Sequence, residues 1–434
     1  MYPPPFHRRI LPWIFAITFV ACAPVVVFYT AGYRWNPLKE QIERNGTMIF
    51  DTQPVGAKIF MNGNDTGDVT PRTIQNVSPG TYQVRYELDG YRPWEKRLDV
   101  FPERVTFAND VRLWKDSAPV KAEDGMFLAV EPSPNGRSIA VLVASGASST
   151  RIDVRSADLT TTGSFELDRG LPAHPRVTWS SDSRAFIVET ETDGTKAAWL
   201  VNVRTDLGPV VLPSAVYRWN GSVLEGNDGT SIVSIQSDDG SISRAPFAFR
   251  VVDTFDDLTL RTATNTDAVV LFRDNDPMRG FILPSGNWTM VMISDGRLIL
   301  RDGASWLSVG MESDTPDTVR ASGDALRPYT EKNSTSYLLV SGGEIWRWDE
   351  GKDAELLLRE SKDIVDAVWH VDGRDVAFAN GTETSILNLD TRDGRIRTLL
   401  TTFTAVRDVA LVGKDMLVAG EKDGQSGLWR IAIE

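Results

Sequence analysis

The stretch Ile10–Tyr33 constrains this chain more than any other part of its sequence. It reads ILPWIFAITFVACAPVVVFYTAGY and contains no charged residue. About twenty consecutive apolar residues allow a helix to cross the hydrocarbon core of a bilayer, which is roughly 30 Å thick. Pro12 falls in the first turn and a kink accommodates Pro24, so neither residue argues against a helix. We expect a transmembrane helix at residues 10–33, with residues 1–9 before it and a large polar body after it.

Two arginines set the expected orientation of this helix. Arg8 and Arg9 precede the apolar stretch, and positively charged flanks favour the cytoplasmic side of a membrane. The chain is therefore predicted to be a single-pass protein of the cell membrane, with a cytoplasmic N-terminus and the bulk of the chain extracytoplasmic. The lipid bilayer is the expected partner of residues 10–33.

Two alternative interpretations of the same stretch stay open. Ala21-Cys22-Ala23 resembles a signal-peptide cleavage site, and the residues up to Cys22 resemble the lipobox of a lipoprotein signal. Pro24 follows the first site directly, and the residues after Cys22 remain apolar as far as Tyr29. Cleavage would leave a hydrophobic segment at the new N-terminus, which favours the uncleaved anchor.

Charge and reactive side chains exclude several classes of function. The formal net charge is −13 and the lysines and arginines form no run, which argues against a nucleic-acid partner. The single cysteine is Cys22, so disulfides and thiol chemistry are not expected in the polar body. The histidines His7, His174 and His370 have no spacing typical of metal ligands. No cofactor and no metal is expected.

Residues 45–115 read as short strands separated by turn residues, and residues 34–44 before them are expected to be a juxtamembrane linker. Lys58–Met61 ends at the strong turn dipeptide Asn62-Gly63 and is followed by an expected loop. Thr81–Leu88 alternates between two faces, as a half-buried strand does. The residues that define the order of turns and strands are Pro54, Gly56, Ala57, Asn62, Gly63, Pro71, Pro79, Gly80, Tyr82, Gly90 and Tyr91.

This order of turns and strands resembles the PEGA domain, a small β-sandwich-like module found in surface-exposed and envelope proteins of prokaryotes. The resemblance implies that the residues just named are structural and that the module acts as an adaptor or spacer. The layout of an anchor followed directly by this module is similar to that of membrane-anchored PEGA proteins of bacteria.

From residue 118 to residue 434 the sequence contains a repeated turn-and-strand unit. Its best copies begin at Ser133, Trp179 and Trp369 and read SPNGRSIAV, WSSDSRAFIV and WHVDGRDVAF. Well-matched neighbours are about forty residues apart, which is the length of one four-stranded blade. The units resemble the repeats of WD40-like and TolB-type β-propellers. The span predicts about seven blades, with six or eight also allowed.

No segment outside the membrane stretch competes well as a helix. Asp353–Lys362 has partly helical character, but Glu355–Leu358 also fits a strand. The predicted fold is therefore all-β for the polar body, with a PEGA sandwich followed by a β-propeller, and one N-terminal transmembrane helix.

Two groups of residues could carry chemistry. Tryptophans that recur with the repeat could stack on sugars, but such positions are more often packed between blades. Acidic groups at Asp253/Asp256/Asp257 and Asp274/Asp276 could bind calcium, but they lack the pattern of an EF-hand loop. The sequence contains no nucleophile elbow, phosphate-binding loop or His-Glu-x-x-His motif, so no catalytic residue can be selected.

The predicted function is that of a non-enzymatic, membrane-anchored protein of the cell envelope. Its propeller would serve as a scaffold or receptor for a protein or glycan partner, with the PEGA module as adaptor. The alternatives are a carbohydrate-active enzyme whose carboxylates have no sequence motif, and a lectin-like binder of the cell wall. Acidic and aromatic side chains that converge in the axial funnel would favour these alternatives.

Overall fold

The computed structural model of this protein describes residues 6–30, 33–36, 41–146, 148–172, 175–192, 195–205, 208–248, 251–262, 268–273, 280–294, 296–311, 317–331, 334–349 and 351–434. Within these ranges the chain has one α-helix and 41 β-strands, which confirms the all-β prediction for the polar body. It divides into two compact units. The first comprises residues 1–116, 391–394 and 434, and the second comprises residues 117–390 and 395–433.

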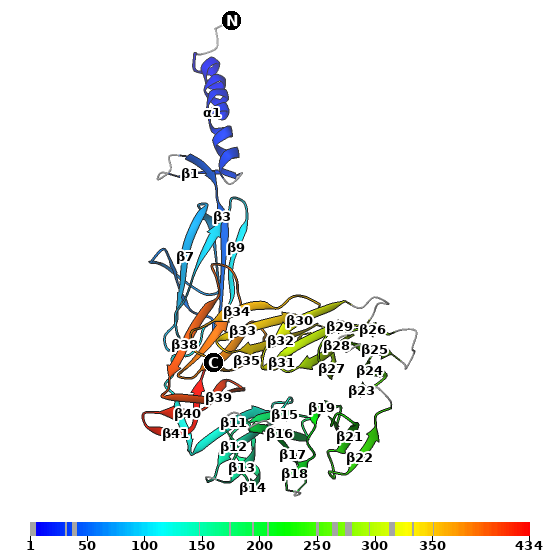
Figure 1. Ribbon diagram of the computed structural model, residues 1–434. Coiled ribbons are helices and arrows are strands. Elements are labelled where there is room, and N and C mark those ends of the chain that lie inside the picture. The colour runs from blue at the N-terminus through cyan, green and yellow to red at the C-terminus, as the bar shows by residue number, and fades with distance from the viewer. Residues whose placement is uncertain are drawn as a thin grey trace. The chain divides into compact units, whose positions relative to one another are not determined.

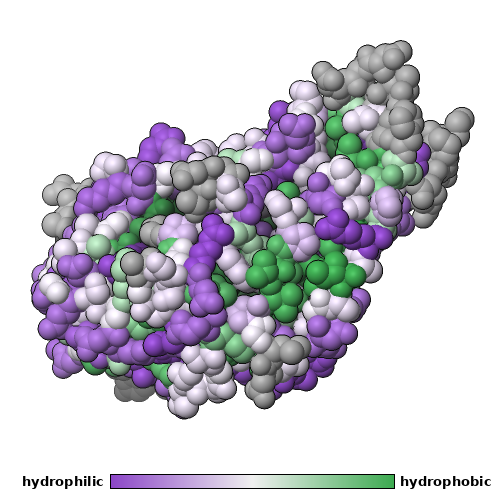
Figure 2. Space-filling view, turned by 60° about the horizontal axis from the view of Figure 1, so that its bottom comes forward, coloured by the Kyte–Doolittle hydropathy of each residue, from purple (hydrophilic) through white to green (hydrophobic). Residues whose placement is uncertain are grey.

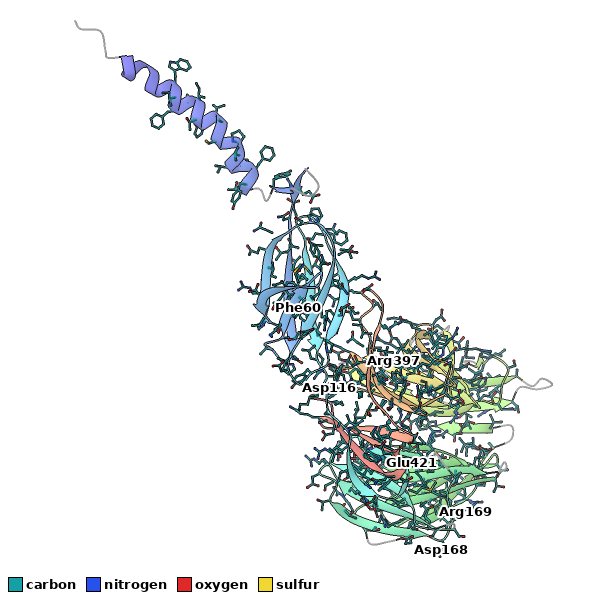
Figure 3. The ribbon with its side chains drawn as sticks, turned by 90° about the vertical axis from the view of Figure 1, so that its left-hand side faces the viewer. Phe60, Asp116, Asp168, Arg169, Arg397 and Glu421 are labelled. Atoms are coloured by element: carbon teal, nitrogen blue, oxygen red, sulfur yellow. The ribbon has the colours of Figure 1, made fainter. Side chains whose placement is uncertain are left out.

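Most of the apolar stretch lies in a single helix, α1 (Phe6–Thr30), long and apolar enough to cross a membrane. The helix begins four residues earlier than predicted and includes Arg8 and Arg9, whereas Tyr33 belongs to the following strand. Its side chains project outward all around the helix (Figure 3). Trp13 is 69% exposed and Phe19 is 72% exposed. So much apolar surface is stable only when a non-aqueous medium covers it. A membrane anchor and a signal sequence near the N-terminus both have this form.

The expected linker at residues 34–44 contains a small hairpin instead of an irregular segment. β1 (Tyr33–Asn36) pairs with β2 (Gln41–Arg44) in antiparallel fashion, with Tyr33 opposite Arg44. The Arg44 guanidinium lies 4.5 Å from the centroid of the Tyr33 ring, a distance at which a cation and an aromatic face attract. The polarity of this segment predicted a linker, but cross-strand pairs of this kind favour a hairpin.

Two sheets form a sandwich in the first unit, as predicted for residues 45–115 (Figure 1). One sheet has the strand order β6-β3-β9, in which β3 and β9 run parallel, and the other has the order β5-β4-β7-β8. The strands are β3 (Gly46–Gln53), β4 (Lys58–Met61), β5 (Asn64–Val69), β6 (Arg72–Val77), β7 (Gly80–Glu87), β8 (Trp94–Val100) and β9 (Val105–Arg112).

The predicted turn and alternation are present in this sandwich. Asn62 and Gly63 both have positive φ values, 49° and 79°, as a two-residue type I′ hairpin requires. Val84 and Tyr86 are buried, whereas Arg85 between them is exposed. The prediction of a loop after Gly63 is wrong, because strand β5 forms there. Its polar residues suit an edge strand that pairs only with β4.

The second unit consists of eight four-stranded antiparallel sheets within the described residues, each forming one blade. In chain order the strands are β10 (Val120–Asp124), β11 (Met126–Pro132), β12 (Ser138–Ala144), β13 (Thr150–Ser156), β14 (Thr161–Leu167), β15 (Arg176–Trp179), β16 (Ala185–Thr192), β17 (Thr195–Asn202), β18 (Val210–Leu212), β19 (Val216–Asn220), β20 (Val223–Asn227), β21 (Ser231–Gln236), β22 (Ile242–Pro246), β23 (Val251–Phe255), β24 (Leu258–Thr262), β25 (Val269–Arg273), β26 (Phe281–Ile282), β27 (Thr289–Ser294), β28 (Arg297–Asp302), β29 (Ser305–Gly310), β30 (Thr318–Ser322), β31 (Ala325–Glu331), β32 (Ser334–Ser341), β33 (Glu344–Asp349), β34 (Glu355–Arg359), β35 (Ile364–Trp369), β36 (Asp375–Asn380), β37 (Glu383–Asn388), β38 (Ile396–Thr402), β39 (Ala405–Val412), β40 (Asp415–Lys422) and β41 (Gln425–Ala432).

The blades follow one another in sequence, from β11–β14 through β35–β38, and the last blade has the order β10-β41-β40-β39. The strands β11, β15, β19, β23, β27, β31, β35 and β39 lie innermost, because they contact one another between sheets. The face seen in Figure 2 carries mostly hydrophilic side chains, with hydrophobic ones gathered in smaller groups.

The sequence predicted about seven blades and allowed six to eight. The observed number, eight, is therefore within the range but one above the favoured value. Two of the blades, β23–β26 and β27–β30, occupy residues 251–322, which contain none of the three well-matched copies of the repeat. Counting by motif therefore underestimates the number of blades. The ambiguous stretch at Asp353–Lys362 contains a strand, β34.

The repeated turn has the same hydrogen bonds in its three best copies. The backbone N–H of Ser133, Ser180 and His370 donates to the carbonyl five residues later, at 2.8, 2.8 and 2.9 Å. Two residues after each of these positions, an Asn or Asp side chain accepts a second backbone N–H. The motif is therefore a compact turn that joins the first two strands of a blade.

Tryptophans at the repeat positions lie between blades, as expected. The indole N–H of Trp179 donates to the carbonyl of Glu131 in the preceding blade, at 3.0 Å. Trp219 donates in the same way to Thr178, at 3.1 Å, and Trp369 to Arg327, at 3.0 Å. These three rings link neighbouring innermost strands, which is a structural duty.

Candidate functional site

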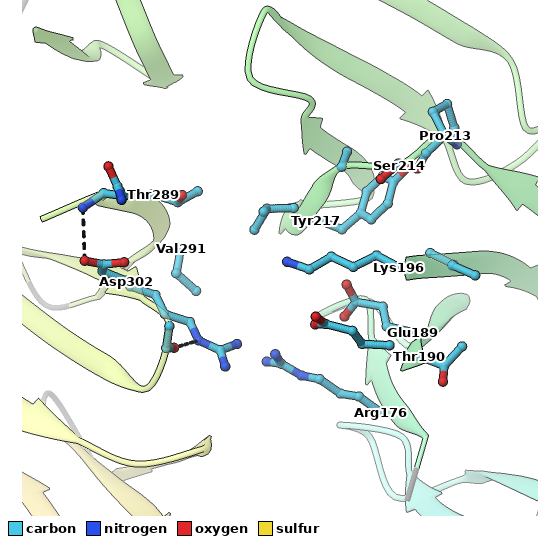
Figure 4. A pocket seen from close by; sticks show the side chains of 18 of the residues that line it. Arg176, Glu189, Thr190, Lys196, Pro213, Ser214, Tyr217, Thr289, Val291 and Asp302 are labelled. Carbon is cyan, nitrogen blue, oxygen red and sulfur yellow. Dashed lines mark hydrogen bonds between the residues drawn. The ribbon is translucent and has the colours of Figure 1, made fainter. Parts of the chain in front are cut away.

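A cavity of about 630 Å3 lies inside the propeller unit, between three of its blades (Figure 4). The innermost strands β15, β19 and β27 all contribute to its wall, so the cavity lies toward the axis of the ring. Its volume is within the range of sites that bind small molecules. This cavity is the best candidate for a binding site in the described part of the chain.

Three positively charged side chains line the cavity from two blades. Arg176 begins β15, Lys196 lies near the start of β17, and Arg301 lies near the end of β28. Arg176 and Lys196 are exposed, and neither makes a hydrogen bond or ion pair with another described residue. They enter the space from the same side (Figure 4).

Arg301 is held more firmly than the other two cations. Its Nε donates to the carbonyl of Gly303 at 2.6 Å, and its guanidinium lies 5.1 Å from the centroid of the Trp306 ring. Burial lowers the pKa of Arg301, and the positive charge of Arg176 lowers it further, while Glu189 opposes both effects. The two guanidinium groups therefore repel each other across the cavity.

Glu189, on β16, is an acidic residue of the cavity wall that interacts electrostatically with all three cations. Burial raises the pKa of its carboxyl, and the charges of Arg176, Arg301 and Lys196 act in the opposite direction. Among the described residues Glu189 has neither an ion-pair partner nor a hydrogen bond. Its attraction to the cations thus acts through space and not by contact.

Two further side chains complete the polar part of the wall. Thr190 is only 8% exposed, and its hydroxyl has no hydrogen-bond partner among the described residues. Such a buried group costs about 1–3 kcal/mol when it stays unsatisfied. The Tyr217 hydroxyl donates to the carbonyl of Pro213, which fixes its ring in the cavity wall.

Ionic networks occupy other parts of the axis. Arg218 on β19 donates to both carboxylate oxygens of Asp253 on β23, at 3.0 and 2.9 Å. Arg327 on β31 forms an ion pair with Glu131 on β11, at 2.9 Å, and another with Asp366 on β35. These pairs tie separate blades together and are satisfied without a ligand.

Among the acidic residues considered for calcium, the three that the structure describes do not form such a site. Asp253 is buried and bound to Arg218, whereas Asp257 is paired with Arg273 at 3.3 Å. Asp256 occupies a turn with a positive φ of 50°. Asp274 and Asp276 lie outside the described residues.

A second acidic group, His370, Asp372 and Asp375, has side-chain atoms close enough to hold a metal ion. However, His370 Nδ1 lies 2.9 Å from Asp372 Oδ1 in the repeated turn, where Ser180 and Asp182 make the equivalent bond in another blade. Asp375 accepts a hydrogen bond from Asn388 at 2.8 Å. This geometry is that of the turn itself. His174 lies outside the described residues.

The residues that carry the PEGA resemblance have structural positions. Ala57 is fully buried, the Asn62 side chain accepts the backbone N–H of Gln83 at 2.8 Å, and Tyr82 donates to the carbonyl of Ser78 at 2.8 Å. Tyr91 forms a β-bridge with Lys115. The prolines of the motif and three of its glycines, which have positive φ values, lie at the turns: Pro54, Gly56, Gly63, Pro71, Pro79 and Gly90.

None of the cavity residues was predicted from the sequence. Arg176, Glu189 and Lys196 lie in a blade whose own turn motif was recognised, but Arg301 comes from the stretch with the weakest repeat. Nothing in the sequence brings positions so far apart together. The only available signal was the presence of cations at strand ends in an acidic chain.

Comparison with known proteins gives one matching domain family and two solved structures of low similarity. Residues 45–113 match the PEGA domain family. Among solved structures, the chain is similar to the crystal structure of the C-terminal WD40 domain of Sif2, with 12% identity over 73% of this chain and 99% of that chain, at a TM-score of 0.44. It is also similar to the dihydro-heme d1 dehydrogenase NirN in complex with DHE, with 16% identity over 74% of this chain and 71% of that chain, at a TM-score of 0.39. Among curated proteins, none matches the chain.

Proposed function

We propose that this protein, which contains a PEGA domain and a β-propeller after an apolar N-terminal helix, is a membrane-anchored scaffold or receptor of the cell envelope. The observation that carries the proposal is the cavity near the propeller axis, where Arg176, Lys196 and Glu189 of one blade have no bonded partner among the described residues and face Arg301 of another blade. The propeller binds a protein or glycan partner, and the PEGA domain acts as adaptor. Catalysis is not part of the proposal.

The test is photo-crosslinking of the full-length protein in intact cells. A crosslinking amino acid at Ser214, an exposed residue of the cavity wall, should give discrete adducts with a protein or glycan. The same amino acid at Arg204, which is exposed but does not line the cavity, is the matched control. Equal adduct patterns at the two positions would reject binding through the cavity.

The location of the propeller follows from the orientation of the helix. We expect a cysteine at Val371, which is 81% exposed, to react with a membrane-impermeant maleimide on intact cells once any outer layer is opened. Cys22 is the only native cysteine, so a Cys22→Ser background gives a single labelled site. Labelling only after lysis would place the propeller in the cytoplasm and overturn the envelope role.

A second candidate function is hydrolysis of a glycan, and the raised pKa of Glu189 favours it. A carboxyl that stays protonated above its usual pH range can act as a general acid. Glu191 and Asp302 line the same cavity and could serve as the second carboxylate. Release of reducing ends from wall glycans by the wild-type protein, lost in Glu189→Gln, would establish the enzyme and displace the receptor.

A further inference from the structure

The cavity near the propeller axis contains an electrostatic arrangement that a ligand would complete. Arg176 and Arg301 come from different blades, and the positive charge of Arg176 repels that of Arg301. Lys196 adds a third cation to the same wall. A chain with a net charge of −13 has carboxylates in excess, yet Arg176 and Lys196 have no bonded carboxylate among the described residues.

Like charges that face one cavity lower stability unless an anion lies between them. Glu189 supplies part of this negative charge, but only through space. Elsewhere near the axis, the arginines Arg218 and Arg327 form direct bonds with carboxylates. The cations of the cavity thus differ from those of the structural networks in this respect.

We infer that the cavity binds the oxyanion, a carboxylate or a phosphate, of a small polar ligand between Arg176 and Arg301. Guanidinium groups bind such planar or tetrahedral oxyanions through charge-assisted hydrogen bonds. Lys196 adds a further donor, and the unsatisfied hydroxyl of Thr190 is a candidate partner for a polar group of the ligand. The inference deepens the proposed function, since it rests on the cavity as the binding site and names the chemistry of what it takes.

The volume of the cavity limits the size of this ligand. About 630 Å3 is enough for an acidic sugar or a comparable small molecule and leaves space beyond the oxyanion itself. The fixed ring of Tyr217 offers an apolar surface in the same wall. We therefore choose glucuronate and inorganic phosphate as probes, with glucose as the neutral counterpart of glucuronate.

The test is isothermal titration calorimetry on the full-length protein in detergent. We expect at least one of the two anions to bind, and glucose to bind at least tenfold more weakly than glucuronate if the sugar acid is the better probe. Arg176→Gln should weaken anion binding about tenfold, because a charged hydrogen bond is lost, and Arg176→Lys should lose less. The control Arg204→Gln should bind as the wild type does.

Two further outcomes separate a binding role from a structural one. Glu189→Gln removes the carboxylate that competes with the anion, so it should tighten anion binding several-fold, which a folding defect cannot do. Arg176→Gln should raise the melting temperature of the ligand-free protein, because repulsion with Arg301 is relieved, and reduce the stabilisation by the anion. A structural arginine would give a lower melting temperature on substitution.

Several results would overturn the inference. These are the absence of binding by either anion at 100-fold excess over the protein, equal affinity for glucose and glucuronate, or weaker anion binding by Glu189→Gln. The outcome of the crosslinking experiment does not depend on these anion-binding results. Anion binding without crosslinked partners would keep the oxyanion site and reject the scaffold, whereas partners without anion binding would do the reverse.

Discussion

Deletion of Ser117–Glu123 is expected to destabilise the whole propeller and not a single blade. β10 supplies the outermost strand of the last blade, whose other three strands come from the end of the chain. Val120 pairs with Arg430 and Asp124 with Gly427, so the ladder joins the two ends of the propeller. Without β10 the ring is no longer closed by hydrogen bonds, and β41 becomes a free edge.

Side chains reinforce this closure on both sides. The Ser117 hydroxyl donates to the carbonyl of Ala432 at 2.6 Å, and Lys121 donates to Gln425 at 2.8 Å. Glu123 accepts from Arg155 of the first blade at 2.5 Å, so β10 also ties the last blade to the first. The ladder pairs four residues of each strand, so its loss costs about 2–4 kcal/mol at about 1 kcal/mol for each hydrogen bond.

The measurement is the melting curve of the full-length protein in detergent, followed by near-ultraviolet circular dichroism. Deletion of Ser117–Glu123 should shift the whole propeller transition to lower temperature. Truncation before Leu428 should shift it further, since Leu428, Trp429 and Ile431 are also buried. The matched control is deletion of β22, an exposed outermost strand that joins no chain ends. If both strand deletions shift the transition equally, closure has no special role.

This closure was predictable because it depends on counting strands. The final repeat supplies three strands, β39, β40 and β41, and a blade needs four. The fourth strand is β10, which follows the PEGA domain in the sequence and pairs with β41. Local turn chemistry was equally predictable, since Asn62-Gly63 and the repeated turns act through backbone geometry within a few residues.

The interior of the ring was not predictable in the same way. Arg176 and Arg301 are brought to one cavity by the order and curvature of several blades, and neither is marked by a motif. The recurrent aspartates Asp253, Asp366 and Asp408 were also missed as a set. Each follows an apolar residue by two positions on an innermost strand, and each lies at a register shift. That apolar-x-Asp pattern was the available signal.

These aspartates share one structural role, which is to accept backbone N–H groups at a β-bulge. In each, a carboxylate oxygen accepts the backbone N–H of the following residue, at 2.9, 2.8 and 2.9 Å. Asp253 and Asp408 also accept a backbone N–H from another innermost strand, Met290 at 2.8 Å and Val130 at 2.7 Å. A short acidic side chain at a bulge thus replaces ladder bonds that the bulge removes.

Asp253→Ala is the single substitution from which we expect the largest loss of stability. Asp253 and Arg218 have side chains only 1% and 4% exposed, and the carboxylate binds Arg218 and two backbone N–H groups. Arg218 also donates to the carbonyl of Met290 at 2.9 Å, so the pair connects three blades. Removing Asp253 leaves the buried Arg218 guanidinium with Glu225, at 3.1 Å, as its remaining ion-pair partner, and leaves two backbone N–H groups without their acceptor, so we expect a cost of about 3 kcal/mol.

The charge and the backbone bonds make separable contributions to this loss. Asp253→Asn keeps hydrogen-bond acceptance for one backbone N–H but removes the charge, so its free energy of unfolding should lie between those of Asp253→Ala and the wild type. The double variant Arg218→Met/Asp253→Leu removes both members of the buried pair and should recover part of the loss of Asp253→Ala, because the only ion it leaves is Glu225, which is 15% exposed and accepts a hydrogen bond from Asn220. Denaturant unfolding of the full-length protein in detergent measures all three. The single variant Arg218→Met is measured for comparison. If its loss of unfolding free energy simply adds to that of Asp253→Ala in the double variant, the two side chains are not coupled. Asp253 would then stabilise the propeller through its backbone hydrogen bonds alone.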